Sequence, residues 1–502
     1  MAAIRSRRSL SGRIALDCVQ PRPSQLQRSG AAAALLPQPA VESGPDSPAG
    51  WRTESGSRLP AVRNPSPPHP VLISDRVHGG IPFVKLLLFS LLATVAPAKG
   101  QIYADFTVSQ GTTSLGTFRA RLDPDKAPRT CANFIGLATG QRPWIKVITG
   151  QIMENRPYFD GLKFHRLIHN FVIQGGSPNG LGTDGPGYVI QDEYHGTLRH
   201  SGRYMLSMAK GSLPCTGGSQ FFITLEAAAF LDDKHSVFGE VIDGKAIIDN
   251  FTNPALFPTS SEKPLTPITM DSVVISGPDL AAFDLQSPAL MLPSVSGTSL
   301  TPSRNSAAST FTVTFNRGFQ TEHLLSTSLN LESWTFSQRV RSRDAASGFA
   351  FTFPGVTSQR FFVSSARVDY GLLPNPAANL LPAGKQFALS DRSGNTLTLV
   401  SNGAGSGTWN HSNGGSGSLT SLAITDSTGT TGFVVESASN AHFFPLTRIV
   451  AGFNAPAGPG NWTAINVLAS FHAPSSGWVE GSAQISGGPG ATSVLQAFTI
   501  TP

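Results

Sequence analysis

Short β-type runs separated by turn residues dominate the chain from residue 104 onward, and only Thr130–Thr139 has clear helical spacing. Branched and aromatic residues favour pleated strands, while Gly, Pro, Asn and Asp between them favour turns. Many strands with few helices predict a β-barrel or a β-sandwich. The runs expected to form strands are Ala104–Val108, Leu115–Leu122, Phe164–Ile168, Phe171–Gln174, Tyr204–Ala209, Gln220–Leu225, Val237–Ile242 and Ile268–Ile275.

The length of 502 residues predicts more than one domain, and 40% hydrophobic residues suffice for packed cores. Charged residues make up 14%, a low share that favours a secreted or surface protein. Residues 1–98 carry 11 of the 37 Lys and Arg residues and 5 of the 31 Asp and Glu residues, so the rest has no net charge. The folded part therefore has no basic excess of the kind that neutralises phosphates, and we expect no nucleic-acid partner.

The first 98 residues divide into two segments. Residues 1–83 are rich in Arg, Pro, Ser, Gly and Ala, a composition that predicts disorder. Residues 84–98 contain a basic residue, an apolar run of ten residues and Ala96-Pro97-Ala98, which together predict a secretory signal peptide. The run is too short to span a bilayer. We expect translation to begin at Val84; the alternative is a genuine disordered extension.

The cysteines are too few to define a framework of disulfides or a metal centre. Cys18 lies in the leader, and Cys131 and Cys215 lie further along; whether these two pair is not decided by the sequence. There is no CxxC pattern and no Cys/His spacing typical of zinc. His165 and His169 are four residues apart, but their segment is predicted to be strand and turn, so we expect no metal.

Five segments, in this order and spacing, resemble the signature blocks of the cyclophilin-type peptidyl-prolyl cis–trans isomerases. They are Phe159–Ile168, Asn170–Gly176, Leu206–Ala209, Gly218–Ile223 and Phe230–Gly239. The resemblance covers residues 99–278. It implies an eight-stranded antiparallel β-barrel with two capping helices, which agrees with the strand-rich pattern, and it implies a prolyl isomerase.

The chemistry of that reaction defines what a site must supply. A prolyl bond isomerises over a barrier of about 18–20 kcal/mol because twisting breaks amide resonance. The twisted proline nitrogen gains a lone pair, so a catalyst needs a donor aimed at it, an apolar pocket for the ring and anchors for the flanking chain. It needs no nucleophile, general base, metal or cofactor, and we expect none.

The resemblance assigns these roles to named residues. It implies that Arg166 is the donor, that Gln174 orients it, and that the proline pocket and peptide anchors complete the site. The catalytic set so implied is Arg166, Gln174, Phe171, Gln220, Phe222 and His235. The substrate-binding set is His165, Val172, Ala209, Lys210, Phe230 and Leu231.

Several positions depart from the family pattern. Val172 stands where Met is usual, Lys210 where Asn is usual, and Phe230 where many eukaryotic members have Trp. Lys210 is expected to contribute mainly through its backbone. An insert at 141–157 lengthens the connection before the catalytic strand and resembles bacterial members.

Beyond residue 278 the sequence is less specific. Residues 279–309 are rich in Pro, Ser and Thr and predict a linker. Alternating runs then predict a small β module at 310–370 and a β-rich module at 371–502, both of sandwich type. Neither contains a recognisable catalytic constellation; a binding or surface-attachment role and a structural spacer both remain open.

These observations together predict a monomeric, exported isomerase that acts on proline-containing polypeptides and assists the folding of other exported proteins. It would be periplasmic, extracellular or attached to the cell surface, without a stable membrane span. Two alternatives stay open: a proline-peptide binding module or chaperone with little catalysis, and a surface-binding protein that acts through its C-terminal β region.

Overall fold

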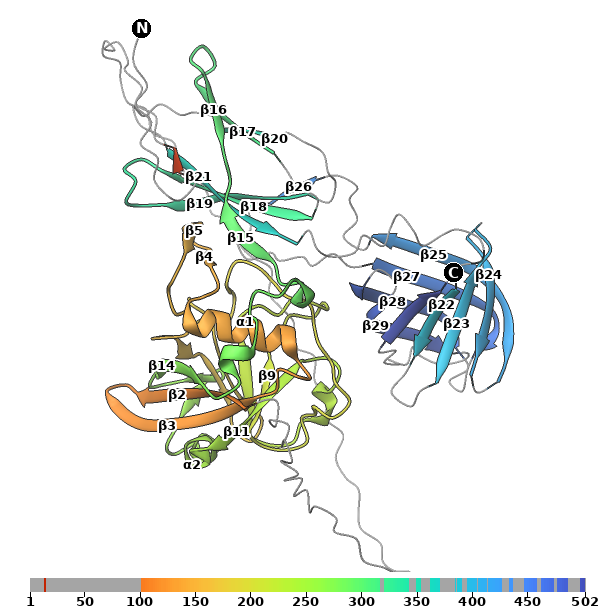
Figure 1. Ribbon diagram of the computed structural model, residues 1–502, viewed down its shortest axis with the longest axis horizontal. Coiled ribbons are helices and arrows are strands. Elements are labelled where there is room, and N and C mark those ends of the chain that lie inside the picture. Colours follow the sequence, from red (N-terminus) through yellow and green to blue (C-terminus); the bar gives the residue numbers. More distant parts are fainter. Residues whose placement is uncertain are drawn as a thin grey trace, which may run out of the picture. The chain divides into compact units, whose positions relative to one another are not determined.

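The computed structural model of the chain is mainly β (Figure 1). It describes Arg13–Ile14, which form β1, and residues 101–501. The gaps within that range are 317–319, 343–348, 354–361, 371–383, 385, 391–394, 404, 413, 427–432, 437–446, 458–461, 474–475 and 486–496. The predicted disordered leader, apart from β1, and the predicted signal peptide lie outside the described residues.

The predicted isomerase region is built on one antiparallel sheet in the order β6-β14-β2-β3-β11-β9-β10-β8-β7. β6 pairs with β14 at one end and β7 pairs with β8 at the other. Because β6 and β7 are separated only by His165, this one broken strand links both ends of the sheet. The strands are β2 (Ile102–Gln110), β3 (Thr113–Leu122), β6 (Lys163–Phe164), β7 (Arg166–Ile168), β8 (Val172–Gly175), β9 (Met205–Met208), β10 (Phe221–Thr224), β11 (Val237–Asp243) and β14 (Ile268–Ser276).

Counting the broken strand once, the barrel has the eight strands that were expected, and the helices α1 (Pro128–Thr139) and α2 (Lys245–Asn250) accompany it. α1 starts with a proline at its first turn, where no backbone donor is lost, and ends at Gly140 with φ of 73°. A Cβ at Gly140 would lie 2.7 Å from the Arg156 backbone, so glycine is required there. The prediction of one helix over 130–139 is confirmed.

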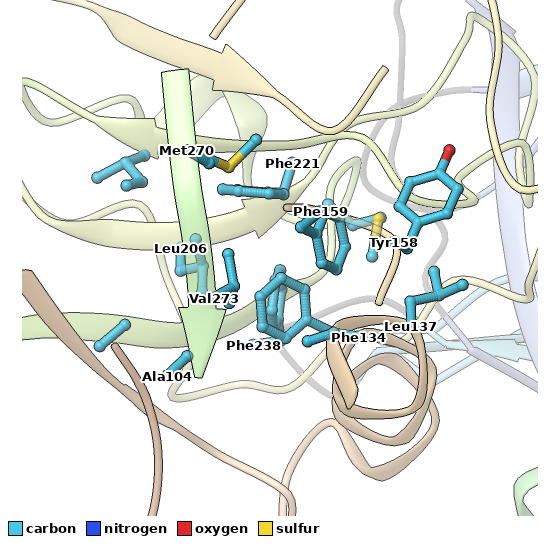
Figure 2. Close-up of a cluster of buried hydrophobic side chains, with 14 of the residues drawn as sticks. Ala104, Phe134, Leu137, Tyr158, Phe159, Leu206, Phe221, Phe238, Met270 and Val273 are labelled. Atoms are coloured by element: carbon cyan, nitrogen blue, oxygen red, sulfur yellow. The ribbon is translucent and has the colours of Figure 1, made fainter. Parts of the chain in front are cut away.

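Aromatic side chains fill the barrel and the space under α1 (Figure 2). Phe134 of α1 stacks on Phe159 at 4.9 Å and meets Phe221 edge-on at 5.6 Å between ring centroids. All three rings are at most 1% exposed. The alternating burial of β2 supplies the facing wall, since every second residue from Ile102 to Val108 is fully buried. This packing holds the strands that carry the candidate site.

Two short hairpins and the 3₁₀ helix η1 lie outside the main sheet of the isomerase region. The insert at 141–157 forms β4 (Trp144–Lys146) and β5 (Gln151–Met153), which pair with each other. β12 (Thr259–Ser260) and β13 (Lys263–Pro264) form a second hairpin, and η1 covers Ala229–Leu231. Cys131 and Cys215 are both buried and are not joined by a disulfide, so the pairing left open by the sequence is not made.

Two sheets follow the isomerase region and share a core, as expected for a sandwich-like module. The first has the order β1-β21-β18-β19-β26 with β15 on β21, and the second is β16-β17-β20. Leu325 and Val340 of the first sheet cluster with Val313 of the second. The strands are β15 (Ser294–Gly297), β16 (Thr301–Asn305), β17 (Thr310–Phe315), β18 (Thr321–Ser328), β19 (Thr335–Ser342), β20 (Phe349–Phe353), β21 (Phe362–Asp369) and β26 (Phe433–Glu436).

The linker predicted at 279–309 is wrong for part of its length, because β15 and β16 lie within it. Their Ser- and Thr-rich sequence forms strands because β21 and β17 supply pairing partners for the backbone. β26, from the segment predicted as a separate 371–502 module, pairs with β19. The module boundaries therefore differ from the sequence-based ones.

The last sheet is a closed barrel, not a sandwich. β30 pairs with both β22 and β29, which closes the sheet between its first and last strands. Its strands are β22 (Gln386–Ser390), β23 (Thr396–Ser401), β24 (Gly407–His411), β25 (Ser416–Asp426), β27 (Thr447–Ala457), β28 (Trp462–Ala473), β29 (Ser476–Ile485) and β30 (Ala497–Thr501).

None of the helices in the described part of the chain has the length and apolar character needed to cross a membrane.

Candidate functional site

Arg166 stands at the start of β7, where two polar side chains hold its guanidinium. Its Nη1 donates to Gln174 Oε1 at 3.4 Å, and its Nε donates to Glu262 Oε2 at 2.6 Å. Arg166 and Gln174 are direct partners in the pairing of β7 with β8, so backbone register places the two side chains together. Arg166 remains 37% exposed, which leaves part of the guanidinium open to solvent.

A line of hydrogen bonds continues from Gln174 into the protein. Gln174 Nε2 donates to Gln220 Oε1 at 3.0 Å, and Gln220 Nε2 donates to the carbonyl oxygens of Gly182 and Asp184 at 2.9 and 2.8 Å. The amide orientations are thereby set: each glutamine oxygen accepts on the Arg166 side and each nitrogen donates away from it. The guanidinium is connected through two side chains to fixed backbone.

An apolar wall stands beside this line. Phe222 is 4% exposed, and its ring meets the His235 ring edge-on with 5.5 Å between centroids. His235 Nδ1 lies 3.0 Å from the carbonyl oxygen of Met208. Burial lowers the pKa of His235 to about 4, so the ring is neutral at pH 7 and adds no charge to the wall.

The expected pocket residues on β8 and η1 lie close by. Phe171 and Phe230 stack with 5.6 Å between ring centroids, and Phe230 is 62% exposed. Val172 is 2% exposed and pairs with Thr224 across β8 and β10. Leu231 ends η1, and its carbonyl oxygen accepts from the His235 backbone N–H at 3.1 Å. The half-buried Phe171 and the exposed Phe230 thus form an aromatic pair at the edge of the buried wall.

Ala209 and Lys210 line a cavity of about 310 Å³ together with Gln174, Gly182 and Gln220. The Ala209 N–H donates to the Gln220 carbonyl at 2.8 Å. Lys210 turns its side chain inward, where Nζ lies 3.1 Å from Asp192 Oδ2 and the side chain is 4% exposed. The Lys210 ammonium group therefore forms a buried ion pair with Asp192.

His165 occupies the break between β6 and β7 and lines a second cavity of about 360 Å³ with Arg166, Leu181 and Glu262. It is 9% exposed, and within the described part of the chain neither ring nitrogen has a hydrogen-bond partner. Burial lowers its pKa to about 4. A Cβ at Gly182 would lie 2.9 Å from His165 Nε2, so only glycine fits. His169, by contrast, bonds the Phe257 carbonyl oxygen through Nε2 at 2.9 Å.

Sequence reasoning missed three residues that support the site. Glu262 binds Arg166, as described above. His200 stacks on Phe222 with 5.7 Å between ring centroids. Its Nδ1 lies 2.8 Å from Asp232 Oδ1, and its Nε2 lies 3.0 Å from Ser207 Oγ. Asp232 lies within a recognised block, but no local pattern connects it with His200. No group of acidic, His or Cys side chains among the described residues is arranged to hold a metal.

Known proteins resemble this chain over its isomerase region. Residues 106–275 match the family model described as cyclophilin type peptidyl-prolyl cis-trans isomerase/CLD. Peptidyl-prolyl cis-trans isomerase B of Streptomyces anulatus is 44% identical over 169 residues, which are 32% of this chain and 93% of that protein. Peptidyl-prolyl cis-trans isomerase A of Mycobacterium tuberculosis is 38% identical over 166 residues, which are 33% of this chain and 89% of that protein.

Among solved structures, a cyclophilin type isomerase of Cryptosporidium parvum is 28% identical and covers 35% of this chain and 98% of its own, with a TM-score of 0.29. The matches cover 93% and 89% of the relatives from Streptomyces and Mycobacterium, and the family model matches the region that contains Arg166. The chain belongs to the cyclophilin-type peptidyl-prolyl cis-trans isomerase family.

Proposed function

We infer that residues 99–278 isomerise prolyl bonds in proline-containing polypeptides through the donor Arg166. The observation that carries this assignment is the line of hydrogen bonds from Arg166 through Gln174 and Gln220 to the carbonyls of Gly182 and Asp184. It fixes a permanently charged donor before substrate arrives, so little reorganisation is needed as the amide twists.

The donor acts on the species that twisting creates. When the prolyl amide loses resonance, its nitrogen becomes pyramidal and gains a lone pair, to which a guanidinium N–H donates more strongly than to the planar ground state. Each 1.36 kcal/mol of such preferential stabilisation gives about tenfold in rate. No proton is transferred, which is consistent with a neutral His235 in the wall of the pocket.

The remaining residues hold the substrate. The proline ring packs on the wall of Phe222 and His235, with Phe171, Val172 and Leu231 completing it. The peptide on one side of the ring lies along Ala209, Lys210 and Gln220, which line the first cavity. The inward ion pair of Lys210 supports the expectation that it binds through its backbone. His165 and Phe230 contact the flanking chain.

The decisive experiment compares full-length wild type with Arg166→Ala in a prolyl-isomerase assay on an uncharged tetrapeptide. Arg203→Ala is a matched control, because Arg203 is 35% exposed and ion-paired where Arg166 is 37% exposed and ion-paired. We expect Arg166→Ala to lose at least about tenfold in kcat/KM and the control to keep its activity. A wild type no faster than solvent would leave a proline-peptide binding module, and an unaffected Arg166→Ala would remove Arg166 from catalysis.

We further propose that the protein is an exported monomer that assists the folding of other exported proteins. The apolar run and Ala-x-Ala pattern in 84–98 support export, and the low content of charged residues agrees with it. Expression in a bacterial host, cell fractionation and N-terminal sequencing test this. Cleavage after Ala98 supports the proposal, while an uncleaved cytoplasmic protein contradicts it. Sedimentation of the processed chain measures its oligomeric state.

A further inference from the structure

The hairpin β12–β13 brings a carboxylate to the guanidinium of Arg166. The backbone N–H of Leu167, the residue next to Arg166 on β7, donates to the Glu262 carbonyl oxygen at 2.7 Å. The hairpin is thereby attached to the catalytic strand by the main chain. This attachment places the Glu262 carboxylate 2.6 Å from Arg166 Nε.

The two contacts of Arg166 leave Nη2 of its guanidinium available. Glu262 accepts from Nε and Gln174 accepts from Nη1. Within the described part of the chain, no protein group accepts from Nη2. Because guanidinium is planar and rigid, two contacts define its plane and aim the two N–H groups of Nη2. The bond to Gln174 is long at 3.4 Å, so the shorter bond to Glu262 contributes more to the orientation.

The turn that carries Glu262 contains residues that seldom adopt its backbone conformation. Ser261 and Glu262 form a two-residue connection between paired Ser260 and Lys263, with φ of 47° and 63°. Such a type I′ turn prefers Asn-Gly, because other residues seldom adopt positive φ at both positions. A side chain kept at an unfavourable φ, directly bonded to the proposed donor, indicates that the carboxylate is required there.

We propose that Glu262 is a positioning residue for catalysis: it fixes the Arg166 guanidinium through Nε so that Nη2 faces the twisting prolyl amide. This inference rests on the proposed role of Arg166. It predicts that loss of the carboxylate lowers kcat and leaves KM nearly unchanged, because the aim of the donor matters in the twisted state more than in the ground state.

The test compares Glu262→Gln, Glu262→Ala and the double variant Ser261→Asn/Glu262→Gly in full-length protein, on an uncharged tetrapeptide. The double variant gives the turn its preferred residues while removing the carboxylate. Glu226→Gln is the matched control, since the Arg203–Glu226 pair is 35% and 47% exposed and the Arg166–Glu262 pair is 37% and 51% exposed.

We expect kcat to fall about three- to tenfold in Glu262→Gln and further in Glu262→Ala, with Glu226→Gln unchanged. The double variant should have a melting temperature at or above that of wild type and still lose isomerase activity. If Glu262 only stabilised the turn, activity would not fall while the melting temperature is kept. Added NaCl should lower the wild-type kcat toward that of Glu262→Gln, because a half-exposed pair is screened by salt.

The result that overturns the inference is a Glu262→Ala protein within about twofold of wild type, or one that is faster, which would mean that Glu262 restrains Arg166. Arg166→Ala, measured in parallel, separates the two proposals. If wild type is active and only Arg166→Ala is impaired, the inference fails and the proposed function stands. If wild type is inactive, the proposed function itself fails.

Discussion

Replacing Gln174 by Leu cuts the hydrogen-bond line at its middle while keeping the side chain close in size. It removes the acceptor for Arg166 Nη1 at 3.4 Å and the donor to Gln220 Oε1 at 3.0 Å. Hydrogen bonds to charged groups contribute about 1.5–3 kcal/mol, and the long first bond argues for the low end. The second is a neutral bond worth about 1 kcal/mol, and losing it frees Gln220 to turn.

Together these losses predict a decrease in kcat/KM of about ten- to a hundredfold, or roughly 1.4–2.7 kcal/mol of transition-state stabilisation. Because Gln174 and Gln220 are only partly buried, the free energy of unfolding should change by about 1 kcal/mol or less. The assay is prolyl isomerisation of an uncharged tetrapeptide, with thermal unfolding followed in parallel.

Gln151→Leu serves as the control, because Gln151 is also half-buried on a short strand and accepts a hydrogen bond from Thr149 Oγ1 at 3.3 Å. It should leave the isomerase rate unchanged. The reasoning is refuted if Gln174→Leu keeps its rate within about twofold of wild type, or if its loss of rate matches an equal loss in the control.

Three further predictions follow from burial and charge. Burial lowers the pKa values of His165 and His235 to about 4 in the folded chain, below the unfolded value, so the free energy of unfolding should fall as pH drops from about 6.5 toward 4. In urea denaturation, the midpoint of His235→Asn should fall less over this pH range than that of wild type. Gly182→Ala should lower the melting temperature by several degrees, because its Cβ would lie 2.9 Å from His165 Nε2 and its φ is +74°. Lys210→Met should lower the free energy of unfolding by about 3 kcal/mol, because Asp192 would be buried without its cation. The double variant Lys210→Met/Asp192→Asn should recover part of this loss. An unchanged denaturation midpoint in Lys210→Met would contradict the inward ion pair.

Local pattern was enough for much of the isomerase barrel. The helix at Thr130–Thr139 and the strands at Ala104–Val108 and Leu115–Leu122 appear at their expected places, since residue spacing acts over a few positions. The strand expected at Phe164–Ile168 is interrupted at His165, because its two halves pair with different partners, β14 and β8. Alternation along a strand does not reveal which neighbour each half will find.

Among the residues of the candidate site, Arg166, Gln174, Gln220, Phe222 and His235 were named from ordered blocks whose spacing is visible in the chain. In the structure, hydrogen bonds join Arg166, Gln174 and Gln220, and Phe222 packs against His235, while their catalytic roles stay predictions. Glu262 could not be predicted, since it lies 96 positions after Arg166 and its hairpin lies in a segment with no recognised pattern.

The sequence by itself determined the family, the strand-rich class and the residue types at the proposed prolyl site, because each is written in local composition and in short blocks. Tertiary structure alone decided the pairing of β15 and β16 inside the presumed linker, the closure of the last barrel by β30, and the ion pair between Glu262 and Arg166. These depend on contacts between residues far apart in the chain, and such contacts are selected by the packing of the whole fold.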